Sequence, residues 1–188
     1  MNNTAERILD IAERLIRSRG YQGFAFREIA EIIGIKSASI HYHFPAKKDL
    51  VEAVMKRYLA RFELALNNLD SQPGTPLQRA ERYMNMYREE ITSHRTMTLC
   101  MMLGADIEIL PDSVVSSLKN FYRLNLDWIG KIILNMASSL SRDEQGKIAA
   151  QILASLNGAM IGARALDDMA YFDHVAEGVS VRLRALVH

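Results

Sequence analysis

The sequence predicts an all-α protein with a small N-terminal three-helix domain, built around a helix-turn-helix, and a larger helical domain after it, about nine helices in total. Three observations support this prediction. Apolar residues recur at helical spacing along nearly all of the 188 residues, without an alternating strand pattern or a repeat. Glycine and proline fall between the periodic segments, where helices end. The composition, 49% hydrophobic and 24% charged, excludes a long disordered protein.

The first three helices are closely spaced. The first begins at Asn3 or Thr4, whose side chains cap free backbone N–H groups, and ends at Gly20, which enters the left-handed conformation without steric cost. Gly34 ends a second helix, and Pro45 ends a third because proline has no backbone N–H to donate. Two short helices joined by a glycine turn form a helix-turn-helix. The second helix is predicted over about residues 27–33 and the third over residues 37–44.

A long fourth helix and five further helices follow. The fourth begins at residues 46–49 and ends near residues 71–76, where two prolines and a glycine make the clearest interruption of the chain. Ser141 and Glu144 predict a capping box at the start of the eighth helix. The helices after the interruption are predicted over residues 77–91, 97–107, 118–136 (after Pro111), 142–166 and 172–187, with the start of the last at about Asp173.

Charge is distributed unevenly along the chain. Residues 1–61 hold eleven Lys/Arg and seven Asp/Glu, a charge of +4, whereas residues 62–188 hold twelve and fifteen, a charge of −3. The formal net charge of +1 therefore conceals a cationic N-terminal part. This distribution favours a polyanionic partner for the first 61 residues.

The segment over residues 34–50 carries most of the functional information. Ser-Ala-Ser at residues 37–39 gives the third helix a small N-terminal end that approaches a DNA groove closely, and Lys36 precedes it. Lys47 lies at the start of the next helix, where free N–H groups hold a phosphate. Helix-turn-helix shapes also occur without DNA, and Tyr and His are ordinary groups at a domain boundary. A purely structural interpretation therefore stays open beside DNA binding.

These residues resemble the TetR family of one-component transcriptional regulators. The family pattern has an Ile-Ala pair, a Gly-Val/Ile turn, a small recognition-helix start, an aromatic and His cluster ending in Phe, and a later Lys. This sequence matches it with Ile29-Ala30, Gly34-Ile35, residues 36–44 and Lys47, and the resemblance covers residues 4 to about 60. It implies that the following residues contact double-stranded DNA: Arg27, Lys36, Ser37, Ala38, Ser39, His41, Tyr42, His43 and Lys47.

Three places depart from the family pattern. Ala38 stands where glycine is common, which stiffens the recognition helix and adds a methyl group at the DNA surface. Ala25 and Phe26 stand where Thr or Ser is frequent, so the usual cap and phosphate contact are in question there. His41 stands where Tyr is common, and the sequence leaves open whether it faces DNA or the domain core.

The resemblance also implies a division into a helix-turn-helix DNA-binding domain, residues 1–47, and a helical effector-binding and dimerisation domain, residues 48–188. Gly158 and Gly162 each cost about 1 kcal/mol against alanine inside a helix, which indicates a packing role. From the residues alone, packing within one chain and packing against a second chain are equal alternatives. TetR-like proteins dimerise through their last two helices, which implies a homodimer formed by residues 142–166 and 172–187 that reads two half-sites of a near-palindrome.

A small-molecule effector is the other partner that the resemblance implies. Aromatic and Met residues of the fifth to seventh helices are candidates for lining its cavity, with His94 and Asn125 orienting it. By periodicity alone, such a stripe is more often plain core. The candidate effector-binding residues are Tyr83, Tyr87, His94, Met97, Met101, Phe121, Asn125 and Trp128.

Three functions follow from these observations. The leading hypothesis is a ligand-responsive repressor that binds a near-palindromic operator as a dimer and is released by its effector. The second is a constitutive DNA-binding protein without an effector. The third is a small helical enzyme, but the sequence has no HExxH, metal-ligand spacing, phosphate loop or nucleophile elbow. We therefore expect no enzymatic activity, no catalytic residue, no cofactor and no metal site.

The sequence also indicates where the protein works. No apolar run approaches the roughly 18 residues needed to span a membrane, and the N-terminus is polar, so we expect a cytoplasmic protein without a membrane partner. Cys100 is the one cysteine, and its neighbours Met97, Met101 and Met102 predict a buried thiol, with a redox-sensing thiol as the alternative.

Overall fold

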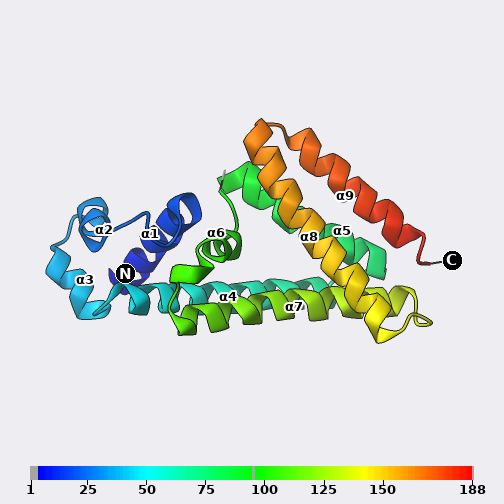
Figure 1. Cartoon of the computed structure of the whole chain (residues 1–188), viewed down its shortest axis with the longest axis horizontal. Coiled ribbons are helices and arrows are strands. Elements are labelled where there is room, and N and C mark those ends of the chain that lie inside the picture. Colours follow the sequence, from blue (N-terminus) through cyan, green and yellow to red (C-terminus); the bar gives the residue numbers. More distant parts are fainter. Residues whose placement is uncertain (1–3, 95, 188) are drawn as a thin grey trace. The chain divides into compact units, whose positions relative to one another are not determined.

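The computed structural model describes residues 4–94 and 96–187, except the side chain of His94. In these ranges it consists of helices joined by turns and loops, without a strand (Figure 1). It confirms the predicted all-α fold, with nine α-helices and one 3₁₀-helix in the part it describes. None of these helices is long and apolar enough to cross a membrane. The helices are α1 (Thr4–Arg19), α2 (Phe26–Ile33), α3 (Ser37–His43), α4 (Lys47–Ser71), α5 (Pro76–His94), α6 (Leu99–Ala105), η1 (Ile107–Ile109), α7 (Asp112–Met136), α8 (Arg142–Leu166) and α9 (Met169–Arg184).

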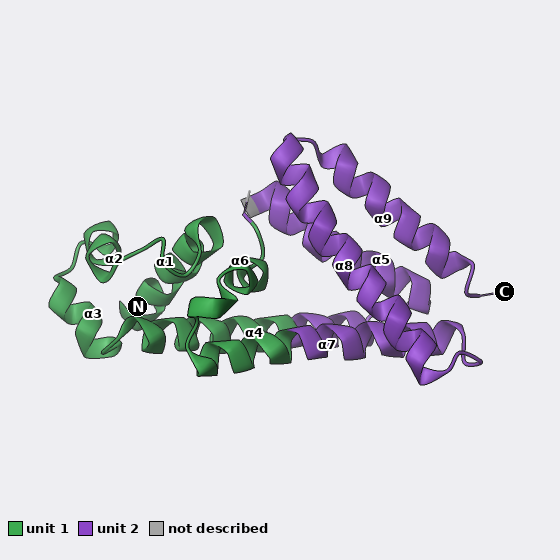
Figure 2. Ribbon diagram, in the orientation of Figure 1, with its two compact units in different colours: residues 1–62, 97–121 green, residues 63–96, 122–188 purple. Residues whose placement is uncertain are grey.

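The chain divides into two compact units, which Figure 2 colours separately. Unit 1 holds residues 1–62 and 97–121, and unit 2 holds residues 63–96 and 122–188. The helices α4 and α7 therefore each contribute residues to both units. The predicted functional boundary at residue 47 is a different kind of division and stays a prediction.

In unit 1, α1 contacts α2, α3 and α6. Ile8, Ile29 and Ile40 are fully buried in this core. Gly20 and Gly34 follow α1 and α2 with φ values of 77° and 78°, a left-handed conformation that favours glycine. Both glycines end their helices where the sequence predicts an end.

In unit 2, α8 and α9 lie side by side and α5 contacts both (Figure 1). Gly162 makes the close approach of α8 to α9 feasible, because a Cβ atom there would lie 2.2 Å from Cε1 of Tyr171. At Gly158, one turn earlier, an added Cβ would meet no atom within 4 Å. The predicted capping box is confirmed, since Ser141 Oγ accepts the Glu144 N–H and Glu144 Oε2 accepts the Ser141 N–H.

The sixth and ninth helices differ from their predicted bounds. The sixth helix spans Leu99–Ala105 rather than residues 97–107, because the Thr98 hydroxyl caps its N-terminus and the chain tightens into η1 after it. The ninth helix begins at Met169 rather than near residue 173. There the Asp168 side chain accepts the Ala170 N–H at 2.9 Å and caps the new helix.

Candidate nucleic-acid interface and small-molecule site

A tight glycine turn connects α2 to α3 in unit 1. The N–H groups of Gly34 and Ile35 both donate to the Ala30 carbonyl, at 2.9 and 3.0 Å, which closes the end of α2. The backbone of Lys36 then takes the extended conformation of an N-cap and α3 begins at the next residue. Because Ile40 on α3 is fully buried, the helix has a fixed inner face and a fixed outer face.

The outer face of α3 carries most of the residues that the sequence assigns to DNA. Lys36, Ala38, His41 and Tyr42 are exposed, and Tyr42 is 85% exposed. The remaining three, Ser37, Ser39 and His43, are half-buried on the same short helix. The structure therefore brings seven of the nine predicted residues together on one element and its N-cap.

His41 is exposed yet engaged with its own domain. Its ring lies 4.9 Å from the ring of Phe26, and its Nδ1 lies 3.2 Å from the Pro45 carbonyl oxygen. These contacts connect the C-terminal half of α3 to the start of α2 and to the turn before α4. Ala25, the N-cap of α2, makes no side-chain cap hydrogen bond, as the absence of Ser or Thr there led us to expect.

Lys47 contacts its own domain rather than projecting freely. Its Nζ donates to the Phe24 carbonyl at 2.7 Å and lies over the rings of Phe24 and Tyr21, 4.2 and 5.2 Å from their centroids. Burial lowers the pKa of the Lys47 ammonium. The adjacent N-terminus of α4 is also occupied, because Asp49 Oδ2 accepts the Ala46 N–H at 2.8 Å. Lys47 thus attaches α4 to the corner between α1 and α2.

Besides the exposed Lys36, Arg27 and Lys48 are solvated cations near this surface. The Arg27 side chain is 86% exposed and its Nε donates to Glu31 Oε1 at 2.9 Å, a hydrogen bond that raises the pKa of the guanidinium. Lys48 is exposed and has no ion-pair partner among the residues that the structure describes. Both lie where a phosphate can approach them.

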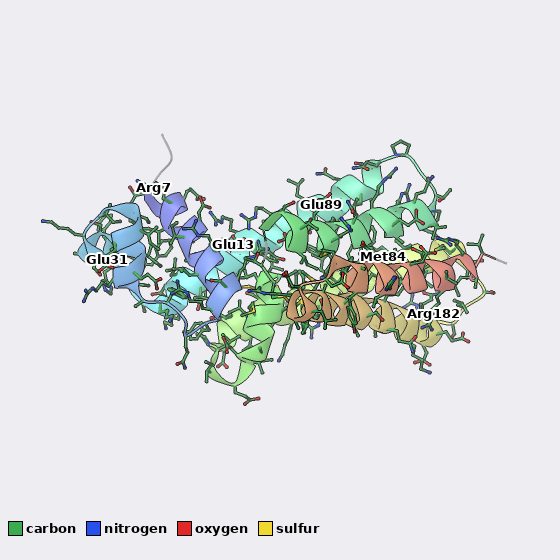
Figure 3. The ribbon with its side chains drawn as sticks, turned by 90° about the horizontal axis from the view of Figure 1, so that it is seen from above. Arg7, Glu13, Glu31, Met84, Glu89 and Arg182 are labelled. Carbon is green, nitrogen blue, oxygen red and sulfur yellow. The ribbon has the colours of Figure 1, made fainter. Side chains whose placement is uncertain are left out.

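A buried ion-pair network joins α1 to α4, and sequence patterns gave no sign of it. Glu13, labelled on α1 in Figure 3, accepts hydrogen bonds from Arg57 Nη2 at 3.1 Å and from Arg61 Nη2 at 2.6 Å. Burial lowers the pKa of Arg57, but the hydrogen bonds that its guanidinium donates to Glu6, Asp10 and Glu13 outweigh burial and hold that pKa above its usual value. The network joins α1 to the middle of α4.

Four of the eight predicted effector-binding residues form one buried cluster in unit 2. Asn125 is fully buried, and its Oδ1 accepts the hydroxyls of Tyr83 at 2.5 Å and Tyr87 at 3.1 Å. The Trp128 ring stacks on Tyr83 with centroids 5.0 Å apart. Its Nε1 donates to Asp70 Oδ1 at 3.0 Å. Polar groups converge here in an apolar surrounding.

Of the other four predicted residues, three belong to unit 1 and one has a side chain that the structure does not describe. Met97, Met101 and Phe121 belong to unit 1, where Phe121 packs on Phe62 with ring centroids 4.8 Å apart. The side chain of His94 lies outside the described residues.

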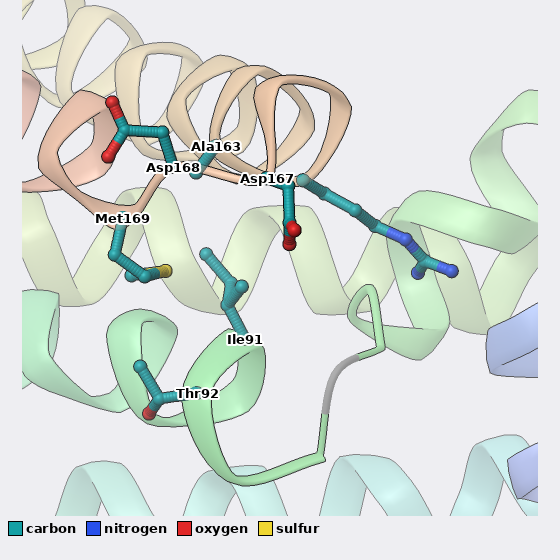
Figure 4. Close-up of a pocket in the computed structure, with 7 residues that line it drawn as sticks. Ile91, Thr92, Ala163, Asp167, Asp168 and Met169 are labelled. Carbon is teal, nitrogen blue, oxygen red and sulfur yellow. The ribbon is translucent and has the colours of Figure 1, made fainter.

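The spaces in unit 2 are unequal in size. The cavity lined by Tyr83, Trp128 and eight further residues has a volume of about 10 Å³, roughly the space of one water molecule. A wider groove of about 520 Å³ lies between the end of α5 and the α8–α9 connection, and sequence reasoning did not find it. Figure 4 shows the Ile91 side chain pointing toward this connection, while the Asp168 side chain points away from Ile91.

Cys100 and the acidic residues do not form a metal-binding cluster in the described part of the chain. No group of three or more His, Cys, Asp or Glu residues described by the structure lies close enough to hold a metal ion. Cys100 is fully buried, and burial raises the pKa of its thiol well above the ordinary value, with the Glu13 charge adding to the shift. A protonated, inaccessible thiol fits the buried-core interpretation.

A buried three-helix core that presents the exposed face of α3 defines a helix-turn-helix protein. Known proteins identify the family: the model of the tetR family of bacterial regulatory proteins matches residues 8–54. A solved TetR-family regulator from Agrobacterium tumefaciens is 30% identical, covers 95% of this chain and 96% of its own, and superposes with a TM-score of 0.89. The chain belongs to the TetR family.

Further relatives extend this result. A TetR regulator from Legionella pneumophila is 29% identical over 97% of this chain and 98% of its own, with a TM-score of 0.91. The transcriptional repressor KstR2 of Mycobacterium tuberculosis is 23% identical over 99 residues, 53% of this chain and 50% of the relative. The chain therefore matches about half the length of that curated relative. IcaR of Staphylococcus aureus, a negative regulator of a biofilm operon, is 39% identical over 51 residues, 27% of each chain.

Proposed function

We propose that this protein is a transcriptional repressor that binds operator DNA through α3 and works in the cytoplasm as a homodimer. The observation that carries the proposal is Tyr42, a large ring that is 85% exposed on a seven-residue helix whose opposite face is held by the fully buried Ile40. Such a helix has a rigid base and a free reading face, as a recognition helix needs. The relatives named as repressors support the direction of regulation.

The DNA-binding step is tested by selection followed by titration. Wild-type protein should enrich a near-palindromic duplex from a random pool, and fluorescence anisotropy should show its affinity falling steeply with salt. Lys36→Ala should weaken binding and reduce the salt slope by about one, whereas Lys131→Ala, an exposed lysine of α7, should leave both unchanged. Failure to enrich any sequence, or equal effects of the two lysine variants, would refute DNA recognition by α3.

The proposed dimer forms through one face of α8 and one of α9. Ile161 of α8 is 57% and Val181 of α9 is 54% exposed, and both are large apolar side chains on helices. Gly158 leaves open space where a partner backbone can approach. A two-fold axis would place the same faces of two chains together. The exposed residues of the α8 face are Ala150, Ala154, Gly158, Ile161 and Ala165.

Oligomeric state tests this interface directly. Ile161→Glu should give a monomer in light scattering coupled to size exclusion, because a charge would be buried at the axis. The matched control is Leu134→Glu, which places the same charge at a 45% exposed leucine of α7 and should leave the dimer intact. A dimeric Ile161→Glu variant, or a monomeric wild type, would rule out this surface.

We further propose that a small-molecule effector enters unit 2 at the cluster of Tyr83, Tyr87, Asn125 and Trp128. The support is chemical: one amide and two hydroxyls converge beside aromatic rings. The cavity of about 10 Å³ admits no such ligand unless the cluster opens. That small volume favours the second candidate function, a constitutive DNA-binding protein.

Ligand screening separates the two candidates. A metabolite library is screened for compounds that raise the melting temperature of the wild type and release it from the selected duplex. The effector hypothesis predicts that such compounds exist. It also predicts that Trp128→Phe weakens the binding of these compounds while leaving DNA affinity unchanged. Absence of any releasing compound across the library, with normal DNA binding, favours the constitutive protein.

A further inference from the structure

Asp106, the residue that joins α6 to η1, holds the corner between α1 and α2. Its Oδ2 accepts the backbone N–H of Tyr21 at 2.6 Å, across 85 residues of sequence. Gly20 closes α1 with a single bond, from its own N–H to the Ile16 carbonyl at 2.8 Å. In this left-handed closure the helix itself supplies no acceptor for the next N–H group. The Tyr21 amide therefore takes its acceptor from Asp106.

Gly20 and Asp106 also fit sterically. A Cβ atom at position 20 would lie 2.5 Å from Asp106 Oδ2, closer than Cβ atoms approach oxygen in proteins. The φ of 77° at Gly20 independently favours glycine. The carboxylate thus occupies space that only glycine leaves open beside the amide it binds.

A second bond ties the same segment to α1. Arg17 Nε donates to the Met97 carbonyl at 3.0 Å, and between Met97 and Asp106 the helix α6 contacts α1. Leu99 and Leu103 of α6 are fully buried. All of these contacts lie within unit 1, so residues 97–106 complete the packing of the C-terminal half of α1.

The corner is held at its other end by Lys47, which binds the Phe24 carbonyl at 2.7 Å. The segment Tyr21–Phe24 is thus fixed at both ends, and α2 begins two residues after it. Because α3 follows α2 through the Gly34 turn, a displaced corner displaces the reading face. We infer that Asp106 is a positioning residue for DNA binding, although it lies far outside the helix-turn-helix in sequence. This inference rests on the proposed function.

The experiment compares three variants of the full chain on the duplex selected by the wild type. Asp106→Ala removes the acceptor of the Tyr21 amide and should weaken DNA binding about tenfold. A tenfold change in affinity corresponds to about 1.4 kcal/mol. Asp106→Asn keeps a carbonyl oxygen in the same place and should restore most of the affinity. Glu108→Ala, at an exposed carboxylate of the neighbouring η1, is the control and should bind like the wild type.

Amide hydrogen exchange over residues 20–25 distinguishes a local loss of the Asp106 contact from a general loss of stability, because a general loss would speed exchange throughout the protein. Asp106→Ala should speed exchange of the Tyr21 amide selectively, and Asp106→Asn should protect it again. If Asp106→Ala melts below the assay temperature, Asp106→Ser replaces it in the same comparison with the same expected loss. Wild-type affinity in the Ala and Ser variants, or an Asn variant as weak as Ala, overturns the inference. If the wild type binds no duplex, the proposed function fails, and exchange still decides whether Asp106 holds the corner.

Discussion

Replacement of the buried Glu13 by alanine should destabilise the protein more than replacement of an exposed carboxylate of the same helix. The Glu13 side chain is 9% exposed and lies among three arginines, Arg17, Arg57 and Arg61, which are 11%, 18% and 51% exposed. Removing one partner of a buried ion pair costs about 3–5 kcal/mol, because the remaining charges lose their compensation. Solvent screens the half-exposed Arg61, so the expected cost for Glu13→Ala is about 3 kcal/mol.

The matched control is Glu6→Ala on the same face of α1. Glu6 accepts a hydrogen bond from Arg57 Nη1 at 3.0 Å, but its side chain is 52% exposed. Exposed pairs contribute about 0–1 kcal/mol, so Glu6→Ala should cost less than about 1 kcal/mol. Both variants remove a carboxylate from Arg57, and they differ in burial and in the further pairs that Glu13 makes with Arg17 and Arg61.

Urea unfolding followed by circular dichroism measures the difference at a fixed protein concentration. With a slope of about 3 kcal/mol/M for a chain of this size, Glu13→Ala should lower the midpoint by about 1 M and Glu6→Ala by less than about 0.3 M. Equal midpoints for the two variants would show that burial of the Glu13 carboxylate adds nothing to the stability of the pair. A changed slope would show that the variant unfolds differently, and then the midpoints would not be compared.

Three further outcomes are expected. Cys100 should react with a thiol reagent only at the rate of opening or unfolding, because its pKa is raised by burial; rapid reaction of the folded protein would contradict this. Asn125→Leu should cost about 1–3 kcal/mol in urea unfolding, because Tyr83 and Tyr87 lose the buried acceptor that they share; an unchanged midpoint would contradict it. The hydrogen bond from Arg88 lowers the pKa of Asp173, so it stabilises the fold above the unfolded pKa of about 4 and is lost as pH falls through the lower folded pKa. Asp173→Asn should therefore flatten the acid limb of the stability profile by less than about 1 kcal/mol, since both side chains are over one third exposed.

Local chemistry made the helix-turn-helix predictable from sequence. Gly34 determines where α2 ends, because its left-handed backbone requires no Cβ, and the spacing of Ile40 from Phe44 determines which side of α3 faces inward. The Ser141–Glu144 capping box placed the start of α8 for the same reason. Each of these signals acts within four residues, a range over which sequence spacing and distance in space are equivalent.

The contacts that sequence reasoning missed join residues far apart along the chain. Glu13 is charged and lies beside the apolar face of α1, and nothing in its neighbourhood predicts that Arg57 and Arg61 will neutralise it. The predicted start of α9 is wrong because Asp168 caps the helix and begins it at Met169, whereas the apolar periodicity of α9 becomes visible only several residues further along the sequence. Packing also decided the size of the cavity beside Trp128, since aromatic side chains fill that space in a way that periodicity does not encode.

Gly158 and Gly162 show why the same residue type can have two different causes. One helical turn separates them, and each costs about 1 kcal/mol against alanine in a helix interior. The ring of Tyr171 accounts for Gly162, because it fills the space where a Cβ would lie. No atom of the described residues lies within 4 Å of a Cβ added at Gly158, which lies on the same exposed face as Ile161. The two glycines therefore have different surroundings: Gly162 serves the α8–α9 contact, whereas Gly158 leaves open space on the face where we propose that a second chain packs.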